Sequence, residues 1–361
     1  MPALMNKLLI FRPPGLMRSA PDVIHRKTIT GLQAAGIPCS VHDLWPQWCA
    51  RRIWGSSLPG RQRIFEYGPA LLSLGWQRRK ISAAGVVWIN GVASPLNRNC
   101  WFERAVLKAG KPYIFHLQDD WFSVPFQRPQ AEARVRLASL VVVPTLPLKD
   151  RILALFPDAK VLVLEEPIDI DRVRPVAASA DSDLPFFVWS GSAESLDDLK
   201  KFTGIFGRIH AKFPFKIRVI CGQTKPAIEM SFPWEWFPYD ATAESVVLAG
   251  AAAGLAPLED GAYARCKGGY KVKTYLAAGI PIVASPVGHH ARVIHSGING
   301  FLADTETEWE QALLALLADR DLGRRLGAAA RESAVTKYSH EVLMPIWADQ
   351  LRAALPQIAG L

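Results

Sequence analysis

Residues 267–290 read KGGYKVKTYLAAGIPIVASPVGHH and combine two lysines and two glycines with an apolar helical pattern, a short strand and a second glycine turn. Gly268 and Gly269 allow backbone amides to approach a ligand closely. A helix N-terminus attracts anions, and ammonium groups at Lys267 and Lys271, four residues apart and so on one helix face, strengthen that attraction. The stretch therefore predicts a diphosphate site at the start of a helix. The alternative is a surface helix with two solvated lysines.

Apolar runs of strand length alternate with helical segments along the first half of the chain. Such alternation predicts a parallel sheet with helices on both faces. The first run precedes Pro13-Pro14-Gly15, and a strand that ends in a glycine turn is typical of the start of a Rossmann-like unit. Strands are expected at 7–11, 85–89, 112–116, 140–143 and 161–164, and helices at 98–109 and 148–156.

The same pattern restarts after VAASADSDLP, a small and polar stretch at residues 176–185. Strands are expected at 186–190, 217–221, 253–257 and 281–284, and helices at 196–212, 289–295, 308–318, 322–337 and 340–355. Thr305 or Thr307 should cap the helix at 308–318, and Pro345 should start or kink the last one.

The two similar halves predict an α/β fold with two Rossmann-like domains. The expected N-terminal domain covers residues 1–175, a linker covers 176–185, and the second domain covers 186–338. A C-terminal helix at 339–361 could pack back on the first domain.

Positive charge is concentrated in the first half of the chain. Residues 1–180 contain 24 Lys and Arg against 13 Asp and Glu, whereas residues 181–361 contain 18 against 20. This asymmetry favours an anionic partner, which could be a membrane surface, a phosphorylated acceptor or a nucleic acid. A solubilising surface bias is the alternative.

The segment WPQWCARRIWG, at 45–55, interleaves tryptophan with arginine, which is typical of the headgroup region of a bilayer. These tryptophans could instead be ordinary core residues. We expect no nucleic acid partner because the basic half contains no recognised nucleic-acid motif.

Composition excludes several other classes. No apolar run reaches the ~18 residues of a membrane-spanning helix, and the first residues show no signal-peptide cleavage pattern. Five cysteines without a CxxC pair predict neither a disulfide framework nor a structural zinc site, and they favour a reducing cytoplasm.

Several stretches resemble a known family. GYKVKTYLAAGIPIVASPVG and the following VIHSGINGFLAD resemble the donor-binding region of GT-B glycosyltransferases, particularly glycosyltransferase family 4 (group 1) and its bacterial relatives. FVWSGSAESLDDLKKF resembles the first strand and helix of that donor domain. GKPYIFHLQDDWF, LASLVVVPT and LVLEEPIDIDRVRP resemble parts of the acceptor domain. The likeness spans residues 85–340.

The resemblance implies a fold, an activity and a location. The fold would be GT-B, with two Rossmann-like domains facing each other across a cleft. The enzyme would move a sugar from a nucleoside diphosphate sugar to a hydroxyl of a cell-surface polysaccharide, lipopolysaccharide or lipid-linked acceptor. It would work in the cytoplasm, where the basic half could associate peripherally with the anionic inner face of the membrane.

The resemblance also assigns donor-binding residues. The diphosphate falls to Lys267 above all, together with Lys271, Gly268, Gly269 and Arg265. The remaining donor-binding candidates come from the turns after the expected strands: Ser190, Gly191, Glu259, Asp260, Gly288, His289 and His290. Glu259 and Asp260 would contact donor hydroxyls or ribose, or else form an exposed acidic loop. The two histidines would bond donor oxygens, or else pack as ordinary side chains.

On the acceptor side, Asp119 and Asp120 follow the strand expected at 112–116. A carboxylate there could take the proton from the attacking hydroxyl in an inverting enzyme, or hold the acceptor in a retaining one. A capping or salt-bridging pair is the alternative. Asp169-Ile-Asp171 is a literal DxD motif, but it falls in the connector between the halves. We therefore expect no metal and no other cofactor, with fixed cations stabilising the leaving diphosphate.

The sequence departs from the family pattern at four positions. Cys266 and Thr274 stand where the family usually has two glutamates, Arg292 stands at a frequent third glutamate, and Gln118 replaces an acceptor-domain histidine. Two other functions therefore stay open: a sugar-nucleotide-modifying enzyme of the same fold, such as an epimerase, and a non-catalytic GT-B partner protein.

Overall fold

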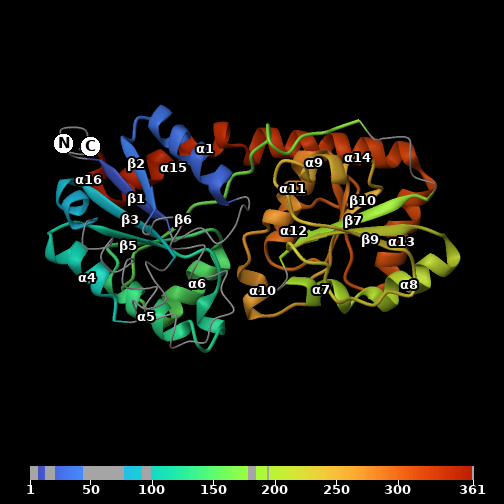
Figure 1. The fold of residues 1–361 in the computed structure, drawn as a ribbon, viewed down its shortest axis with the longest axis horizontal. Coiled ribbons are helices and arrows are strands. Elements are labelled where there is room, and N and C mark those ends of the chain that lie inside the picture. The colour runs from blue at the N-terminus through green and yellow to red at the C-terminus, as the bar shows by residue number, and fades with distance from the viewer. Residues whose placement is uncertain are drawn as a thin grey trace. The chain divides into compact units, whose positions relative to one another are not determined.

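The computed structural model describes residues 7–12, 21–43, 77–91, 99–177, 184–192 and 195–359. The chain divides into two compact units. Unit 1 comprises Met1–Glu165 with Leu343–Leu361, and unit 2 comprises Glu166–Val342. Most of the predicted linker at 176–185 and the whole of the tryptophan-rich segment at 45–55 lie outside the described residues. Each unit contains a six-stranded sheet whose paired strands are parallel (Figure 1). The α/β expectation is thus confirmed.

The sheet of unit 1 has the order β2-β1-β3-β4-β5-β6. Its strands are β1 (Leu8–Arg12), β2 (Cys39–Asp43), β3 (Val86–Asn90), β4 (Tyr113–His116), β5 (Leu140–Val143) and β6 (Val161–Val163). Five of the six match predicted strands. The apolar residues of β1, β3, β4 and β5 are buried on both faces, as in other parallel sheets, whereas the edge strand β6 is half-buried. The edge strand β2 was missed, since CSVHD is polar and mostly half-buried.

Helices cover both faces of this sheet: α1 (Pro21–Ala34), α4 (Trp101–Lys108), α5 (Arg128–Leu137), α6 (Leu146–Leu155), α15 (His340–Ala354) and α16 (Pro356–Ala359). The end of the chain belongs to the core of unit 1. The Trp347 ring of α15 stacks on Trp88 of β3 at 6.4 Å, and its Nε1 donates to the Glu165 carbonyl oxygen at 2.9 Å. Because α15 begins at His340, Pro345 lies inside the helix and does not start it, which corrects one form of the prediction.

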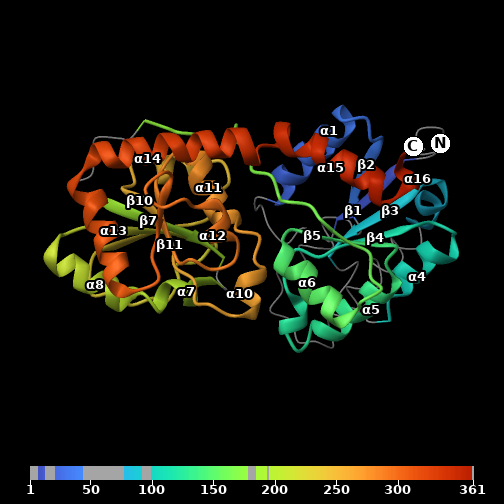
Figure 2. The same ribbon diagram turned by 180° about the vertical axis from the view of Figure 1, so that it is seen from behind.

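The sheet of unit 2 has the order β12-β11-β10-β7-β8-β9 (Figure 2). Its strands are β7 (Phe186–Gly191), β8 (Lys216–Cys221), β9 (Trp234–Phe237), β10 (Ala253–Ala256), β11 (Ile282–Ala284) and β12 (Gly300–Leu302). The two edge strands, β9 and β12, were not predicted. Strand order reverses beside β7, which pairs with both β8 and β10. In open α/β sheets, ligands bind beyond the carboxyl ends of the strands at such a switch point.

The helices of unit 2 are α7 (Leu196–Lys200), α8 (Thr203–Lys212), α9 (Glu244–Leu248), α10 (Ala262–Cys266), α11 (Tyr270–Ala278), α12 (His289–Val293), α13 (Glu306–Ala318) and α14 (Arg320–Ser333). The single helix predicted at 196–212 is wrong, because a tight turn in which the Phe202 amide donates to the Leu199 carbonyl separates α7 from α8. Thr305 caps α13 through a capping box with Glu308, as one of the two predicted caps. No described helix has the length and apolarity that crossing a membrane requires.

Candidate functional site

The predicted phosphate stretch forms a turn, a helix start and a strand at the carboxyl edge of the unit 2 sheet. Gly269 is the N-cap of the nine-residue α11, in the left-handed region at φ 66°. That conformation favours glycine, because a side chain there is strained. The backbone N–H groups of the first helical turn have no partner inside the helix and carry partial positive charge. The expected anion-attracting helix start is therefore present.

Lys271 lies in the first turn of α11, and its ammonium is 4.1 Å from the centre of the Trp189 ring at the end of β7. Among the described residues, no carboxylate forms an ion pair with it. Burial is the main cause that lowers the pKa of Lys271 to about 7, and the charge of Lys267 acts in the same direction. An anionic ligand would balance the positive charge of a half-buried lysine that has no carboxylate partner.

Lys267 is not on the same helix face as Lys271, which corrects the expectation from their spacing. It is the C-cap of α10 and precedes the N-cap of α11 by two residues. Its ammonium lies 3.2 Å from the Asp198 carboxylate of α7 and 5.5 Å from the centre of the Tyr263 ring. Lys267 and Lys271 are nevertheless close enough for the charge of the first to affect the pKa of the second.

Two glycines bring the α10–α11 and β11–α12 turns into close contact. A Cβ on Gly269 would lie 2.5 Å from the His289 ring, and one on Gly288 would lie 2.6 Å from the Arg265 carbonyl oxygen. Gly288 is also in a positive-φ conformation, at 54°. Both positions therefore require glycine for space as well as for backbone conformation. Gly268 lies between Lys267 and this packed turn.

His289 and His290 are both buried at the start of α12. The His290 Nδ1 lies 3.3 Å from the Ser285 carbonyl oxygen. Burial, followed by the charge of Lys271, lowers the pKa of His290 to about 3. His290 is therefore neutral near pH 7 and adds no charge to the two lysines. Direct bonds from the histidines to a donor stay predictions.

Ser190 connects the end of β7 to the helices beside it. Its backbone N–H donates to the Tyr275 hydroxyl at 2.8 Å, and its hydroxyl donates to Glu244 at 3.3 Å. The Tyr275 hydroxyl in turn donates to the Leu255 carbonyl oxygen of β10 at 3.3 Å. A Cβ on Gly191 would lie 2.6 Å from the Ser195 hydroxyl and from the Trp189 ring. Ser190 thus holds the strand switch point together, and Gly191 leaves room for the tryptophan under Lys271.

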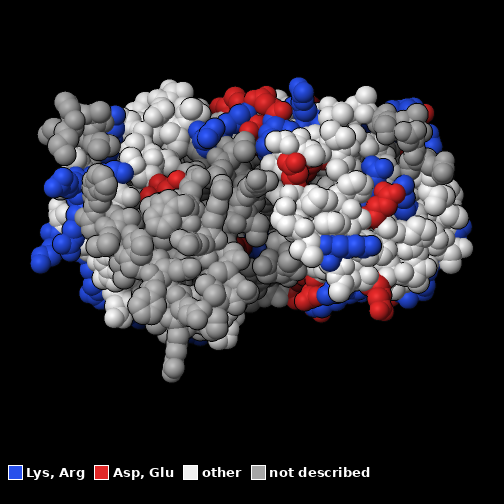
Figure 3. Space-filling model, in the orientation of Figure 1, with Lys and Arg blue, Asp and Glu red and all other residues white. Residues whose placement is uncertain are grey.

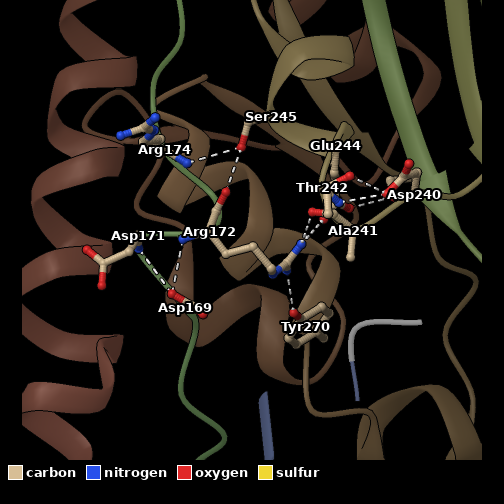
Figure 4. Close-up of polar contacts among 11 residues, drawn as sticks. Asp169, Asp171, Arg172, Arg174, Asp240, Ala241, Thr242, Glu244, Ser245 and Tyr270 are labelled. Atoms are coloured by element: carbon tan, nitrogen blue, oxygen red, sulfur yellow. Dashed lines mark hydrogen bonds and ion pairs between the residues drawn. The ribbon is translucent and has the colours of Figure 1, made fainter. Parts of the chain in front are cut away.

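A buried polar network continues from Glu244 to the first residue of α11 (Figure 4). Arg172 donates to Glu244 at 2.9 Å, to the Ala241 carbonyl oxygen at 3.1 Å and to the Tyr270 hydroxyl at 2.9 Å. Both members of the Arg172–Glu244 pair are less than a tenth exposed. The opposite charges and the hydrogen bonds to neighbouring groups compensate the desolvation of this pair. The network fixes the start of α11, next to Lys271.

Sequence inspection missed this network and two further contacts of the site. Arg172 and Tyr270 lie 98 positions apart, and Lys267 and its partner Asp198 lie 69 apart. Trp189 was read only as part of a strand. These residues lie in different stretches of the chain, so only the fold brings them together.

The acidic loop after β10 is exposed, and its carboxylates pair with nearby cations. Glu259 pairs with Lys201, and Asp260 accepts two hydrogen bonds from Arg265, at 2.7 and 2.5 Å. These bonds lower the pKa of Asp260. Glu259 and Asp260 thus contact cations of their own unit. A donor contact by Glu259, Asp260 or Arg265 stays a prediction.

In unit 1, Asp120 has the contacts of a cap. It is buried, and its carboxylate accepts from the Phe122 amide at 3.0 Å and the Ser123 hydroxyl at 2.5 Å. Arg151 lies 2.8 Å from the same carboxylate. Asp119 is only half-buried. A catalytic role for either residue stays a prediction, but Asp120 clearly holds the turn after β4.

The DxD motif forms a local turn. The Asp169 carboxylate accepts from the backbone amides of Asp171 and Arg172, both at 3.1 Å (Figure 4). Within the ranges that the structure describes, no three His, Cys, Asp or Glu side chains converge as metal ligands.

Two of the four positions that depart from the family pattern, Cys266 and Thr274, are buried in unit 2, whereas Gln118 and Arg292 are exposed. Cys266 ends α10 and Thr274 lies in α11, and each is at most 2% exposed. In the described part of the chain, the Thr274 hydroxyl has no hydrogen-bond partner. Neither residue can replace the charge of a glutamate.

Comparison with solved structures defines the class of fold. Sucrose-phosphate synthase from Thermosynechococcus elongatus superposes with a TM-score of 0.65 at 14% identity, covering 98% of this chain and 100% of that one. HepE from Anabaena, solved with UDP and glucose, gives 0.67 at 13% identity, covering 96% and 100%. A Rickettsia africae glycosyltransferase gives 0.63 at 12% identity, covering 97% and 99%. The chain has the GT-B glycosyltransferase fold.

Sequence comparison matches part of the second unit to a known family. Residues 197–319 match the family model of the group 1 glycosyl transferases. The predicted resemblance to that family is confirmed. The sequence has no significant match among curated proteins.

Proposed function

We propose that the protein transfers a sugar from a nucleoside diphosphate sugar to a hydroxyl of a glycan or lipid-linked acceptor of the cell surface. The group 1 match supports the glycosyltransferase class, and HepE, which has a similar fold, was solved in complex with UDP and glucose. The proposed acceptor class also includes lipopolysaccharide and polysaccharide. The proposed site of work is the cytoplasm, at the anionic inner face of the membrane.

One observation carries the donor assignment. Lys271 keeps an ammonium against Trp189, next to Lys267 and the start of α11, without a carboxylate ion pair in the described residues. A diphosphate there would gain two ammonium groups and the N–H groups of the first turn. Its charge would raise the pKa of Lys271 and hold that side chain protonated.

The same groups would assist bond cleavage. Negative charge grows on the leaving diphosphate as the sugar is transferred, and fixed cations stabilise that charge in the transition state. The proposed mechanism therefore uses Lys267, Lys271 and the helix dipole in place of a metal ion. On the acceptor side, Asp119 is the better candidate for contact with the hydroxyl, because hydrogen bonds already engage both oxygens of Asp120.

Calorimetry against UDP, GDP and CMP and their sugars tests the donor assignment. We expect binding of one nucleotide, and we expect Lys271→Ala to weaken it by about 10- to 100-fold, since a charge-assisted hydrogen bond contributes roughly 1.5–3 kcal/mol. Lys200→Ala, at an exposed lysine of α7, is the matched control and should change nothing. If no nucleotide binds, a non-catalytic partner protein is favoured instead. Isomerised nucleotide sugar without any acceptor would point to an epimerase.

A further inference from the structure

The short helix α7 brings a carboxylate to the candidate phosphate site. The Asp198 carboxylate lies 3.2 Å from the Lys267 ammonium, and the Lys267 and Asp198 side chains are 29% and 21% exposed. Within the described residues, Lys267 is the one cation that forms an ion pair with Asp198. Burial and the charge of Lys267 lower the pKa of Lys271, and the charge of Asp198 opposes them. Asp198 therefore acts on both ammonium groups that the proposed diphosphate would meet.

Two ion pairs of opposite polarity connect α7 to the stretch that precedes α11. Asp198 pairs with Lys267, and Lys201, the C-cap of α7, pairs with Glu259. The Lys201–Glu259 pair is the more exposed of the two, so solvent screens it more strongly. Figure 3 shows red and blue side chains beside one another at the lower edge of unit 2, where α7 lies in Figure 1. The two pairs hold Asp198 next to the start of the phosphate site.

A carboxylate beside a phosphate-binding ammonium acts against the phosphate. A diphosphate that binds Lys267 must share the ammonium with Asp198, and the two anions repel each other more strongly as the charge of the ligand rises. Sugar transfer breaks the bond between the sugar carbon and the diphosphate oxygen, while the acceptor oxygen bonds that carbon and releases its proton. The diphosphate therefore leaves with one more negative charge than it carried in the donor, and the repulsion by Asp198 is larger for the product.

We propose that Asp198 weakens binding of the nucleoside diphosphate product more than binding of the sugar donor, and thereby favours product release. Asp198 pairs with Lys267 in the free protein and regains that ammonium as the product leaves. It acts through Lys267 and through charge repulsion, and it takes no part in bond cleavage. A purely structural role would weaken both ligands when the side chain is changed. The inference rests on the proposed function, and it adds how the same site discriminates between donor and product.

Calorimetry on the full-length protein tests the proposal, with UDP against UDP-glucose, GDP against GDP-mannose, and inorganic pyrophosphate as a probe that needs no matching base. Asp198→Asn removes the charge and keeps the shape of the side chain. It should tighten the diphosphate that binds, and pyrophosphate, by about tenfold, but the matching sugar nucleotide by only about threefold, because repulsion scales with ligand charge. Asp198→Ser makes the same charge change and should give the same order of gains. High salt should reduce both gains.

Asp197→Asn is the matched control, since Asp197 lies in the same helix but is 77% exposed and pairs with Lys200 at 3.0 Å. Equal gains in this control would overturn the proposal, because overall charge would then explain them. Unchanged or weaker diphosphate binding in both Asp198 variants, or equal gains for donor and product, would also overturn it and would leave the proposed donor site intact. If wild type and all variants bind no nucleotide and no pyrophosphate, the proposed function is refuted, and this inference with it.

Discussion

Two charged side chains, one at the carboxyl edge of each sheet, differ in whether an oppositely charged partner contacts them. In unit 1, Asp120 follows β4, and its carboxylate accepts hydrogen bonds from the Phe122 amide and the Ser123 hydroxyl and pairs with Arg151. In unit 2, Lys271 lies beside β7 against an aromatic ring, and burial lowers its pKa to about 7. A charged group whose partners are all present stabilises its own turn. A desolvated ammonium without a carboxylate partner lowers stability until an anionic ligand binds it. The difference indicates that the charge open to a ligand is on the unit 2 edge.

The largest expected effect on stability concerns the Arg172–Glu244 pair. This pair is buried and hydrogen-bonded, and its network reaches Tyr270, the residue before Lys271. Arg172→Ala would leave the Glu244 carboxylate buried without its cation, and breaking a buried pair in this way costs roughly 3–5 kcal/mol. Denaturant unfolding should show that loss. Tyr270→Phe removes only one hydroxyl from the same network and should cost about 1 kcal/mol. Equal effects from the two variants would contradict the arrangement in which Glu244 depends on Arg172.

Asp120 and Asp119 provide the next test, on the unit 1 edge. Asp120→Ala removes a cap and leaves Arg151 unpaired, so the free energy of unfolding should fall by roughly 1–3 kcal/mol. Asp119→Asn should alter stability by less than about 0.5 kcal/mol while reducing turnover. Thermal unfolding and an acceptor assay, run on both variants, check this division. Full turnover in Asp119→Asn would remove that residue from the chemistry.

The smallest effect concerns protons at Lys271. With a pKa of about 7, part of this lysine is neutral in the free protein near neutral pH, and an anionic ligand would drive proton uptake. Nucleotide affinity should fall by up to about tenfold per pH unit above 7. Calorimetry in buffers with different ionisation enthalpies would measure the uptake, which Lys271→Met should abolish. Uptake that persists in Lys271→Met would assign the proton to another group.

The lowered pKa of Lys271 also predicts how the free energy of unfolding depends on pH. The unfolded chain holds this proton up to the ordinary lysine pKa near 10.5, whereas the folded protein releases it from about pH 7. Because the unfolded state binds more protons between these values, unfolding free energy should rise with pH across that window. The partial exposure of Lys271 reduces the size of the effect.

Sequence reasoning predicted the central strands well and the edge strands poorly. Most residues of the eight central strands are apolar and buried, which gives each strand a clear local signal: β1, β3, β4, β5, β7, β8, β10 and β11. β9 and β12 lack that signal: WEWF is half-buried, and GFL is too short for a period to emerge. The single helix predicted at 196–212 failed for the opposite reason, because a helical sequence pattern continues through the turn that separates α7 from α8.

For the candidate site, local sequence motifs predicted the glycine turns but not the side-chain contacts. The glycines at 269 and 288 lie in turns, as predicted, and each has a positive φ and no space for a side chain. Their approach to a ligand stays a prediction. The shared helix face of Lys267 and Lys271 was wrong, because the helix begins only at Tyr270. Trp189 and Asp198 could not be assigned, since each meets its lysine from a distant part of the chain.

The sequence by itself determined the alternation of strands and helices, the glycine turns and the presence of cations near a helix start, because all of these are local properties of the chain. Only the tertiary structure decided which charges are satisfied. Whether Lys271 meets a carboxylate or a ring, and whether Asp120 is open or capped, depends on residues brought together by folding. Electrostatic energy depends on distance and burial in space, and neither can be read along the chain.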